Sequence, residues 1–416
     1  MRLLLLRHLS LAAFGLFVTE LTAAPSRVSI NSDQVLVVNG QKVFPIGFTT
    51  PPPPDGKTPA GKNAIAELAA AGATFLRTGA PETGWNDATW QREQKYLDAA
   101  ARYGLHCMPY LREDACLISE AREAQLRGLL ARFKDHPGLG VWKGDDEPEW
   151  AKTPLPPLLR TRQVIKELDP DHPLVIIHAP RGTVESLRQY NGCGDILGAD
   201  IYPISYPPGI HSLRTNRSIS LVGDYTRTMM EVADGKMPVW MVLQISWSGV
   251  LQPGKTLRFP TFPEERFMTY EAVINGARGL IYFGGNNQKA MSPADSKLGW
   301  NWTFWRRVLR PVIEEIGSRS PLYPALVAPN STLPVKVTGA TGMEFCVRET
   351  GSDLFILACK SAGGTAKVEF TGLPEAAGKA EVMFESPRTV TAQRGKFTDW
   401  FGPFEVHAYR CGLSPR

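Results

Sequence analysis

Hydrophobic and polar positions follow two alternating patterns along most of the chain. Short apolar runs, typical of buried strands, alternate with longer stretches in which apolar residues recur every three or four positions, as in amphipathic helices. The predicted strands are 45–49, 74–78, 106–111, 139–143, 174–178, 196–202, 239–243 and 279–283. The predicted helices are 61–71, 87–103, 120–134, 155–168, 184–190, 224–233, 263–275 and 303–316.

Eight successive strand–helix units predict an α/β fold, a (β/α)8 TIM barrel over residues 44–322. An open doubly wound sheet is the alternative, but no phosphate-binding glycine motif follows an early strand. Two polar residues are expected to cap helix N-termini, and three glycines fall where helices end in a left-handed residue. These are Asp87 and Ser119, and Gly72, Gly104 and Gly276.

Smaller units flank the predicted barrel. Asn39-Gly40 is a two-residue turn signal between apolar runs, which predicts an N-terminal β-hairpin over residues 25–43. Residues 323–416 contain short alternating strands divided by glycine-rich turns, and no helical pattern. This pattern predicts a small C-terminal β-sandwich with an accessory role.

The first 24 residues have the features of a secretory signal peptide. Arg2 and Arg7 precede an apolar core, and small residues end at Ala24. No cysteine follows that would carry a lipid, and no later apolar run is long enough to span a membrane. We therefore expect a secreted or periplasmic protein without a membrane anchor. The net charge of +5 is scattered, so it indicates no nucleic-acid partner.

The chain has six cysteines, and export would permit disulfides between them. Buried thiols that act as small apolar residues are an equal alternative. Cys346 and Cys359 flank one predicted hairpin and are the first pair to test. No cysteine pair has the spacing of a metal site, and we expect neither a metal nor a cofactor.

One stretch concentrates acidic residues at the end of an apolar run. The strand predicted at 139–143 leads into Asp145, Asp146 and Glu147, and Pro148 then removes a backbone donor and ends the strand. Crowded like charges separate the pKa values of neighbouring carboxyls, so that one of them becomes a usable acid. A solvated acidic turn is the simpler alternative. The apolar strand before it favours an active site.

Polar and aromatic residues follow the other predicted strands as well. In a barrel the chemistry lies where strands meet their following loops, and sugars need many hydrogen-bond partners and flat apolar faces. Each residue alone has a structural explanation, but together they predict a carbohydrate-binding cleft. The candidate substrate-binding residues are Arg77, Glu82, Asp114, Asp145, His178, Tyr202, Gln244, Trp247 and Asn286.

At these positions the chain resembles the (β/α)8 glycoside hydrolases of the cellulase and β-galactosidase superfamily. Residues 38–47 are similar to the hairpin that leads into the first barrel strand there, and residues 71–77 resemble the second strand with its arginine. Residues 142–148 resemble the fourth strand, with Asp-Glu-Pro where Asn-Glu-Pro is usual, and residues 276–283 resemble the eighth. The resemblance extends to about residue 320.

The resemblance implies roles for several residues. Glu147 matches the general acid/base, and Asp146 stands where an asparagine contacts the sugar 2-position. Arg77 and Tyr202 match supports of the nucleophile region. The chain departs from the pattern at Gln244, which stands where those enzymes have a glutamate nucleophile. A neutral amide cannot form the glycosyl-enzyme bond of the usual retaining mechanism.

Three alternatives remain without that carboxylate. Asp200 could activate water as the base of an inverting reaction, which needs carboxyls about 6.5–9.5 Å apart. The substrate's own 2-acetamido group could be the nucleophile, oriented by Asp146, because residues 144–147 resemble a strand end of β-N-acetylhexosaminidases. The third is a non-catalytic carbohydrate-binding protein. We predict a secreted glycoside hydrolase of poly- or oligosaccharides with Glu147 as general acid, and favour Asp200 as the base.

Overall fold

The computed structural model describes residues 24–81, 84–207, 212, 214–250 and 254–413. Residues 1–23 of the predicted leader and the candidate site residue Glu82 lie outside this part of the chain. Within the described ranges, no helix combines the length and the hydrophobicity needed to cross a bilayer.

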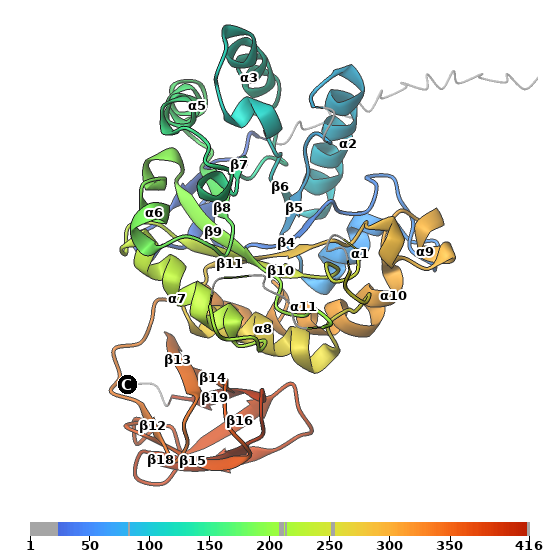
Figure 1. Ribbon diagram of the computed structural model, residues 1–416. Helices are drawn as coiled ribbons and strands as arrows, with labels where there is room; N and C mark the ends of the chain where they lie inside the picture. Colours follow the sequence, from blue (N-terminus) through green and yellow to red (C-terminus); the bar gives the residue numbers. More distant parts are fainter. Residues whose placement is uncertain (1–23, 82–83, 208–211, 213, 251–253, 414–416) are drawn as a thin grey trace, which may run out of the picture.

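Eight parallel strands form the central sheet, which curls into a barrel (Figure 1). Their order is β6-β5-β4-β11-β10-β9-β8-β7, and bridges from Cys107 to Leu139 and from Tyr110 to Lys143 join the two ends of the sheet. Buried residues on both faces of β10 fit a parallel strand covered by helices outside and side chains inside. The strands are β4 (Ile46–Thr49), β5 (Phe75–Arg77), β6 (His106–Cys107), β7 (Trp142–Asp146), β8 (Leu174–His178), β9 (Ile196–Ile201), β10 (Val239–Gln244) and β11 (Gly279–Phe283).

Helices connect the strands and cover the outside of the barrel. They are α1 (Ala64–Ala71), α2 (Asp87–Tyr103), α3 (Glu120–Phe133), α4 (Pro148–Ala151), α5 (Leu155–Leu168), α6 (Val184–Arg188), α7 (Leu221–Ala233), α8 (Phe262–Ile274), α9 (Pro293–Lys297), α10 (Trp302–Phe304), α11 (Arg310–Ile316) and α12 (Tyr323–Leu326). Short helical turns lie at Arg112–Ala115, Asn191–Cys193, Gln288–Ala290 and Trp305–Leu309.

The helix ends match the predicted signals with one correction. Ser119 caps α3, and Gly72 and Gly104 are left-handed residues at the ends of α1 and α2. Gly276 is also left-handed, just after α8. The cap of α2 is Asn86, whose side chain accepts a hydrogen bond from the Thr89 amide, whereas Asp87 is the first residue of the helix.

A small three-stranded sheet closes the bottom of the barrel. It consists of β1 (Val28–Ile30), β2 (Leu36–Val38) and β3 (Gln41–Val43), with Asn39 and Gly40 at positive φ in the turn. Its apolar side chains pack in one cluster with the barrel interior. The Val28 amide donates to the Asp171 carbonyl, just before β8 begins, which places this sheet at the amino-terminal ends of the barrel strands.

The chain ends in two antiparallel sheets that enclose a second hydrophobic core. One has the order β12-β15-β18, and the other β13-β14-β19-β16-β17. The strands are β12 (Lys336–Thr338), β13 (Met343–Thr350), β14 (Asp353–Lys360), β15 (Ala366–Thr371), β16 (Lys379–Met383), β17 (Thr389–Thr391), β18 (Lys396–Phe401) and β19 (Val406–Gly412). The fold is therefore a (β/α)8 barrel followed by a small C-terminal β-sandwich.

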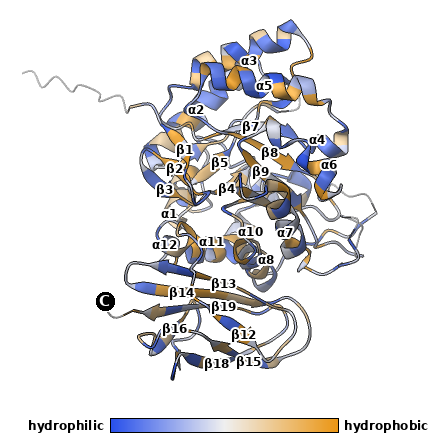
Figure 2. Ribbon diagram, turned by 90° about the vertical axis from the view of Figure 1, so that its left-hand side faces the viewer, coloured by the Kyte–Doolittle hydropathy of each residue, from blue (hydrophilic) through white to orange (hydrophobic). Residues whose placement is uncertain are grey.

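The sandwich packs against the barrel through the sheet that contains β13, β14 and β19 (Figure 2). Their apolar residues join the main core cluster, and Arg227 of α7 pairs with Glu344 of β13 at 2.9 Å. Cys346 and Cys359 belong to this shared cluster but lie opposite Leu357 and Glu344, not each other. All six cysteines are free thiols, so the structure does not contain the disulfide suggested for this pair.

Candidate active site

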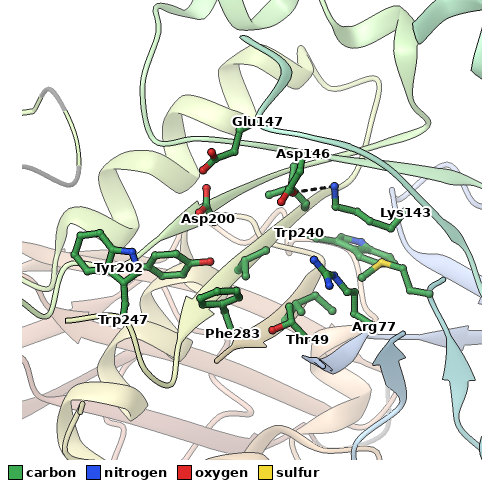
Figure 3. Close-up of a pocket in the computed structure, with 14 residues that line it drawn as sticks. Thr49, Arg77, Lys143, Asp146, Glu147, Asp200, Tyr202, Trp240, Trp247 and Phe283 are labelled. Carbon is green, nitrogen blue, oxygen red and sulfur yellow. Dashed lines mark ion pairs between the residues drawn. The ribbon is translucent and has the colours of Figure 1, made fainter. Parts of the chain in front are cut away.

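A cavity of about 240 Å³ opens at the carboxyl ends of the barrel strands (Figure 3). Polar groups gather on its walls, and apolar side chains from inside the barrel form much of the remaining surface. The lining residues are Thr49, Arg77, Met108, Lys143, Asp146, Glu147, Ile177, Asp200, Tyr202, Trp240, Val242, Trp247, Ile281 and Phe283.

An irregularity in β7 decides which of the three consecutive carboxylates enters the cavity. Lys143 pairs with Val175 of β8, but the next pair is Asp146 with Ile177, so β7 has one residue more than its partner over this interval. Such a bulge re-aims the side chains that follow it. In a regular strand Lys143 would share a face with Asp145, whereas here it shares the cavity with Asp146. Asp145 instead bonds to the Thr153 side chain.

Glu147 follows the bulge in a left-handed backbone conformation, with φ of 53°. A residue with a Cβ atom adopts this conformation only at a cost, and such strain clusters at functional sites. The Glu147 amide donates to the Ile177 carbonyl at 2.7 Å, and Pro148 begins α4 directly afterwards. The backbone therefore fixes the direction in which the Glu147 carboxyl leaves the strand.

Lys143 and Asp146 form an ion pair in the cavity wall, with Nζ and Oδ1 2.9 Å apart. The Lys143 side chain is only 2% exposed, and its Nζ also donates to the carbonyls of Gly144 and Asp145. Partial burial opposes ionisation of Asp146, whose side chain is 42% exposed, but the charges of Lys143 and Arg77 lower its pKa below the ordinary value. Asp146 is therefore a carboxylate that faces the cavity.

Glu147 and Asp200 make direct hydrogen-bond contact across the cavity, and Figure 3 shows their carboxyl groups pointing toward each other. Two carboxyls can make this contact only when they hold a proton between them. Burial first, and neighbouring charge second, raise the pKa of both groups, well above the ordinary value for Asp200. One proton of the pair is thus retained far above the usual range of a carboxylic acid.

This contact bears on the predicted role of Asp200 as the base of an inverting reaction, which stays a prediction. Such a base must stand about 6.5–9.5 Å from the acid, so that a water molecule fits between it and the sugar. In the structure the Glu147 and Asp200 carboxyls contact each other instead.

Aromatic side chains form the wall beside the acid pair. Tyr202 stacks on Phe283 with 5.2 Å between ring centroids, and Trp247 lies against the other side of Tyr202 at 5.8 Å. Trp240 lies deeper, among the barrel interior residues. Flat apolar faces of this kind suit the CH surfaces of a sugar ring.

Gln244 is not part of the cavity surface, contrary to the expectation that it contacts substrate. The side chain is fully buried, and its amide oxygen accepts from the Ile204 amide at 2.8 Å. Its amide nitrogen donates to the Ile204 carbonyl at 3.0 Å. Both polar ends are thereby satisfied, and Gln244 ties β10 to the segment that follows β9.

Four further candidates also lie away from the cavity lining. Asp145 is turned toward Thr153. Asp114 is buried in a helical turn after β6, where burial raises its pKa to about 6. His178 is fully buried against Tyr190, and burial lowers its pKa to about 4. Asn286 is exposed and accepts a hydrogen bond from Thr50 at 2.6 Å.

The cavity brings together Arg77, Asp146, Glu147, Asp200, Tyr202 and Trp247 of the predicted set. Sequence reasoning missed Lys143, although a lysine inside an apolar strand is a usable signal, because lysines are rarely buried without a partner. Thr49 and the apolar residues of the floor carry no comparable signal. Among the described residues, no group of three or more His, Cys, Asp and Glu side chains is arranged to hold a metal.

Comparison with known proteins identifies the fold but not a sequence family. The sequence matches no family model and no curated protein. A family 5 glycoside hydrolase from Bacteroides vulgatus superposes with a TM-score of 0.65 at 13% identity, with 93% of each chain covered. A protein described as a glycoside hydrolase gives 0.60 at 13% identity, covering 93% of this chain and 97% of the other.

A family 30 endoxylanase from Clostridium papyrosolvens has a TM-score of 0.52 at 12% identity, with 93% of this chain and all of the other covered. The structural neighbours thus include glycoside hydrolases of families 5 and 30, both at low identity. Similarity at this level supports the shared fold, while the activity of this chain depends on its own residues.

Proposed function

We propose that the protein is a glycoside hydrolase in which Glu147 is the general acid. The observation that carries this proposal is a pair of adjacent carboxyls whose pKa values diverge in one cavity. The pKa of Asp146 is lowered by Lys143 and Arg77, and that of Glu147 is raised by burial and by Asp146. Two carboxyls whose environments move their pKa values apart can act as acid and charged partner, here Glu147 and Asp146.

The reaction needs a nucleophile or a base, and the two protein candidates are badly placed for it. Gln244 is neutral and bonded to Ile204, and Asp200 touches the acid itself. We propose that the substrate supplies the nucleophile through a 2-acetamido group. Oδ1 of Asp146 is bonded to Lys143, which leaves Oδ2 to accept the acetamido N–H. The apolar floor formed by Met108 and Trp240 suits the acetyl methyl group.

In this mechanism the acetamido oxygen attacks the anomeric carbon while the glycosidic bond breaks. The leaving oxygen takes the proton of Glu147. Ionised Asp146 stabilises the positive charge that develops on the acetamido nitrogen. Water then opens the cyclic intermediate, with Glu147 as base, and the product retains the anomeric configuration of the substrate. We further propose that the protein works after export, as its leader sequence suggests.

The test is release of reducing ends from a panel of N-acetylated and non-acetylated glycans. We expect hydrolysis of the N-acetylated members, and a fall in kcat of about 10²–10⁴-fold in Glu147→Gln, with sugar binding retained. Glu149→Gln is the matched control, because Glu149 lies two residues away on α4 and pairs with Lys152. It should keep wild-type turnover.

The alternative function, carbohydrate binding without cleavage, gives a different result. The panel members would then bind with no release of product, and Glu147→Gln would change nothing but affinity. Unchanged turnover in Glu147→Gln would remove this residue from the mechanism.

A further inference from the structure

The guanidinium of Arg77 lies in the cavity wall, and no described residue accepts a hydrogen bond from it. Arg77 ends β5 and is half-buried, and its Cζ lies 4.7 Å from the centre of the Tyr110 ring. Its side chain makes no hydrogen bond and no ion pair within the described part of the chain. Burial lowers its pKa. The guanidinium carries five donors, and those that face the cavity are open to a ligand that accepts from them.

The protein does not neutralise this charge from within. Lys143 is a second cation in the same wall, 4.8 Å from the Tyr110 ring centre, and Asp146 is the carboxylate that faces both. Asp146 is already bonded to Lys143, so its attraction for Arg77 acts over a longer distance. Glu147 and Asp200 contact each other instead. This side of the cavity therefore has an excess of positive charge.

We propose that Arg77 binds an anionic substituent, a carboxylate or a sulfate ester, on the sugar that occupies the cavity. The proposal deepens the proposed function and rests on it, because it names the class of sugar that the same cavity takes. A planar guanidinium can donate two parallel hydrogen bonds to either group, and the charge of Lys143 adds to the attraction. Figure 3 shows the Arg77 guanidinium apart from Glu147 and Asp200, so an anion bound to Arg77 would lie away from the acid pair.

The experiment measures binding, so that it does not depend on turnover. Titration calorimetry on Glu147→Gln would compare glucuronic acid with glucose, N-acetylmuramic acid with N-acetylglucosamine, and N-acetylglucosamine 6-sulfate with the same neutral sugar. We expect at least one acidic probe to bind about tenfold tighter than its neutral partner, the contribution of a charged hydrogen-bonded contact. The preference should weaken as salt is raised.

Two variants assign the preference to Arg77. Arg77→Gln should abolish the preference for acidic probes. Arg77→Lys should keep part of it, because an ammonium retains the charge but cannot donate two parallel hydrogen bonds. Arg112→Gln is the matched control. Arg112 lies 4.6 Å from the same Tyr110 ring, but its Nε donates to the Ala80 carbonyl and it is not among the cavity residues. This variant should leave the preference intact.

The outcomes separate this inference from the proposed function. Equal binding of acidic and neutral probes, absence of binding by every acidic probe at millimolar concentration, or an unchanged preference in Arg77→Gln would each overturn it. Hydrolysis that depends on Glu147 but favours neutral sugars would defeat the inference alone. An acidic preference in a protein that hydrolyses no glycan would support the inference and defeat the proposed function.

Discussion

The carboxyl ends of β7 and β10 lie three strands apart in the same sheet and differ in almost every respect. β7 is bulged, ends in Asp145 and Asp146, and leads into Glu147 in a left-handed conformation. β10 is regular, and the polar residues at its end and just after it are buried and hydrogen-bonded to neighbouring loops. Gln244 bonds to Ile204, the Ser246 hydroxyl donates to Gly284, and that of Ser248 donates to Thr256.

This difference shows how one barrel divides its strand ends between chemistry and stability. At the end of β7 the carboxyls of Asp146 and Glu147 have partners of their own, but these partners also line the cavity, so the carboxyls stay open to a ligand. At β10 the polar groups are satisfied internally, as buried polar groups must be in order not to destabilise the fold. The comparison therefore predicts opposite responses to substitution: at β7 catalysis should suffer, and at β10 folding.

The largest expected effect is at Asp146. Asp146→Asn removes the charge that should stabilise the developing cation, so kcat should fall by about 10²–10⁴-fold. Because the change also leaves the buried Lys143 ammonium without its partner, the unfolding free energy is measured beside kcat. Asp145→Asn is its neighbour control, since Asp145 points toward Thr153, and it should retain most activity.

Proton NMR of the first product completes this test. A retained anomer in the wild type agrees with participation of the 2-acetamido group. An inverted anomer, with Asp146→Asn fully active, would show that the nucleophile has been assigned wrongly.

A smaller effect, on stability, is expected at Gln244. In Gln244→Glu the new carboxyl can replace both bonds to Ile204 only while it is protonated, so its pKa in the folded protein is raised. The unfolding free energy should then match the wild type below about pH 4, the unfolded pKa of a glutamate, and fall at higher pH.

We expect a loss on the order of 2–4 kcal/mol by pH 8, measured by urea denaturation across pH. Gain of glycosidase activity with a trapped covalent adduct in this variant would contradict the structural role of Gln244. Gln244→Met has no charge to titrate, so the loss in its unfolding free energy should be the same at pH 4 and at pH 8.

The smallest effect is a displacement of the pH profile in Asp200→Asn. In the proposed mechanism Glu147 must hold a proton to act as acid, so we expect loss of the proton shared by Glu147 and Asp200 to limit activity at alkaline pH. The asparagine amide would donate to ionised Glu147 and lower its pKa, so the alkaline limb of kcat/KM should move about one unit toward acid.

Asp114→Asn provides the comparison for this shift. The pKa of Asp114 is also raised, to about 6, but this residue is outside the cavity. Its variant should leave the alkaline limb in place. An alkaline limb that moves equally in both variants would indicate a general effect on the protein.

The fold could be predicted from sequence because its strands are short, apolar and separated by helices with clear ends. β8 and β11 begin and end at the predicted residues, as do α2 and α5. The lengths of the strands were predicted less accurately than their positions. The predicted strand 106–111 stops at Cys107, because Pro109 has no amide to pair. Isolated bridges from Tyr110 to Gly79 and to Lys143 continue it.

The site residues were predicted less completely, because the direction in which a strand side chain points depends on how the strand pairs with its neighbours. Strand period from Lys143 would place Asp145 in the cavity, and only the bulge in β7 places Asp146 there. A bulge has no reliable sequence signal. Gln244 presents the opposite case, because its position at a strand end indicates a ligand contact, while its actual partners belong to a segment 40 residues earlier.

The sheet at the bottom of the barrel has a consequence for the order in which the protein can assemble during synthesis. Ser26 donates to the Leu139 carbonyl, 113 residues later, and contacts the ring of His172, 146 residues later. The first part of the described chain to leave the ribosome must therefore wait for more than a third of the protein before its partners exist. Contacts of such long range slow folding and prolong the exposure of apolar surface. In a chain that is exported before it folds, the N-terminal sheet could dock onto the barrel only after the segment up to β8 has crossed the membrane.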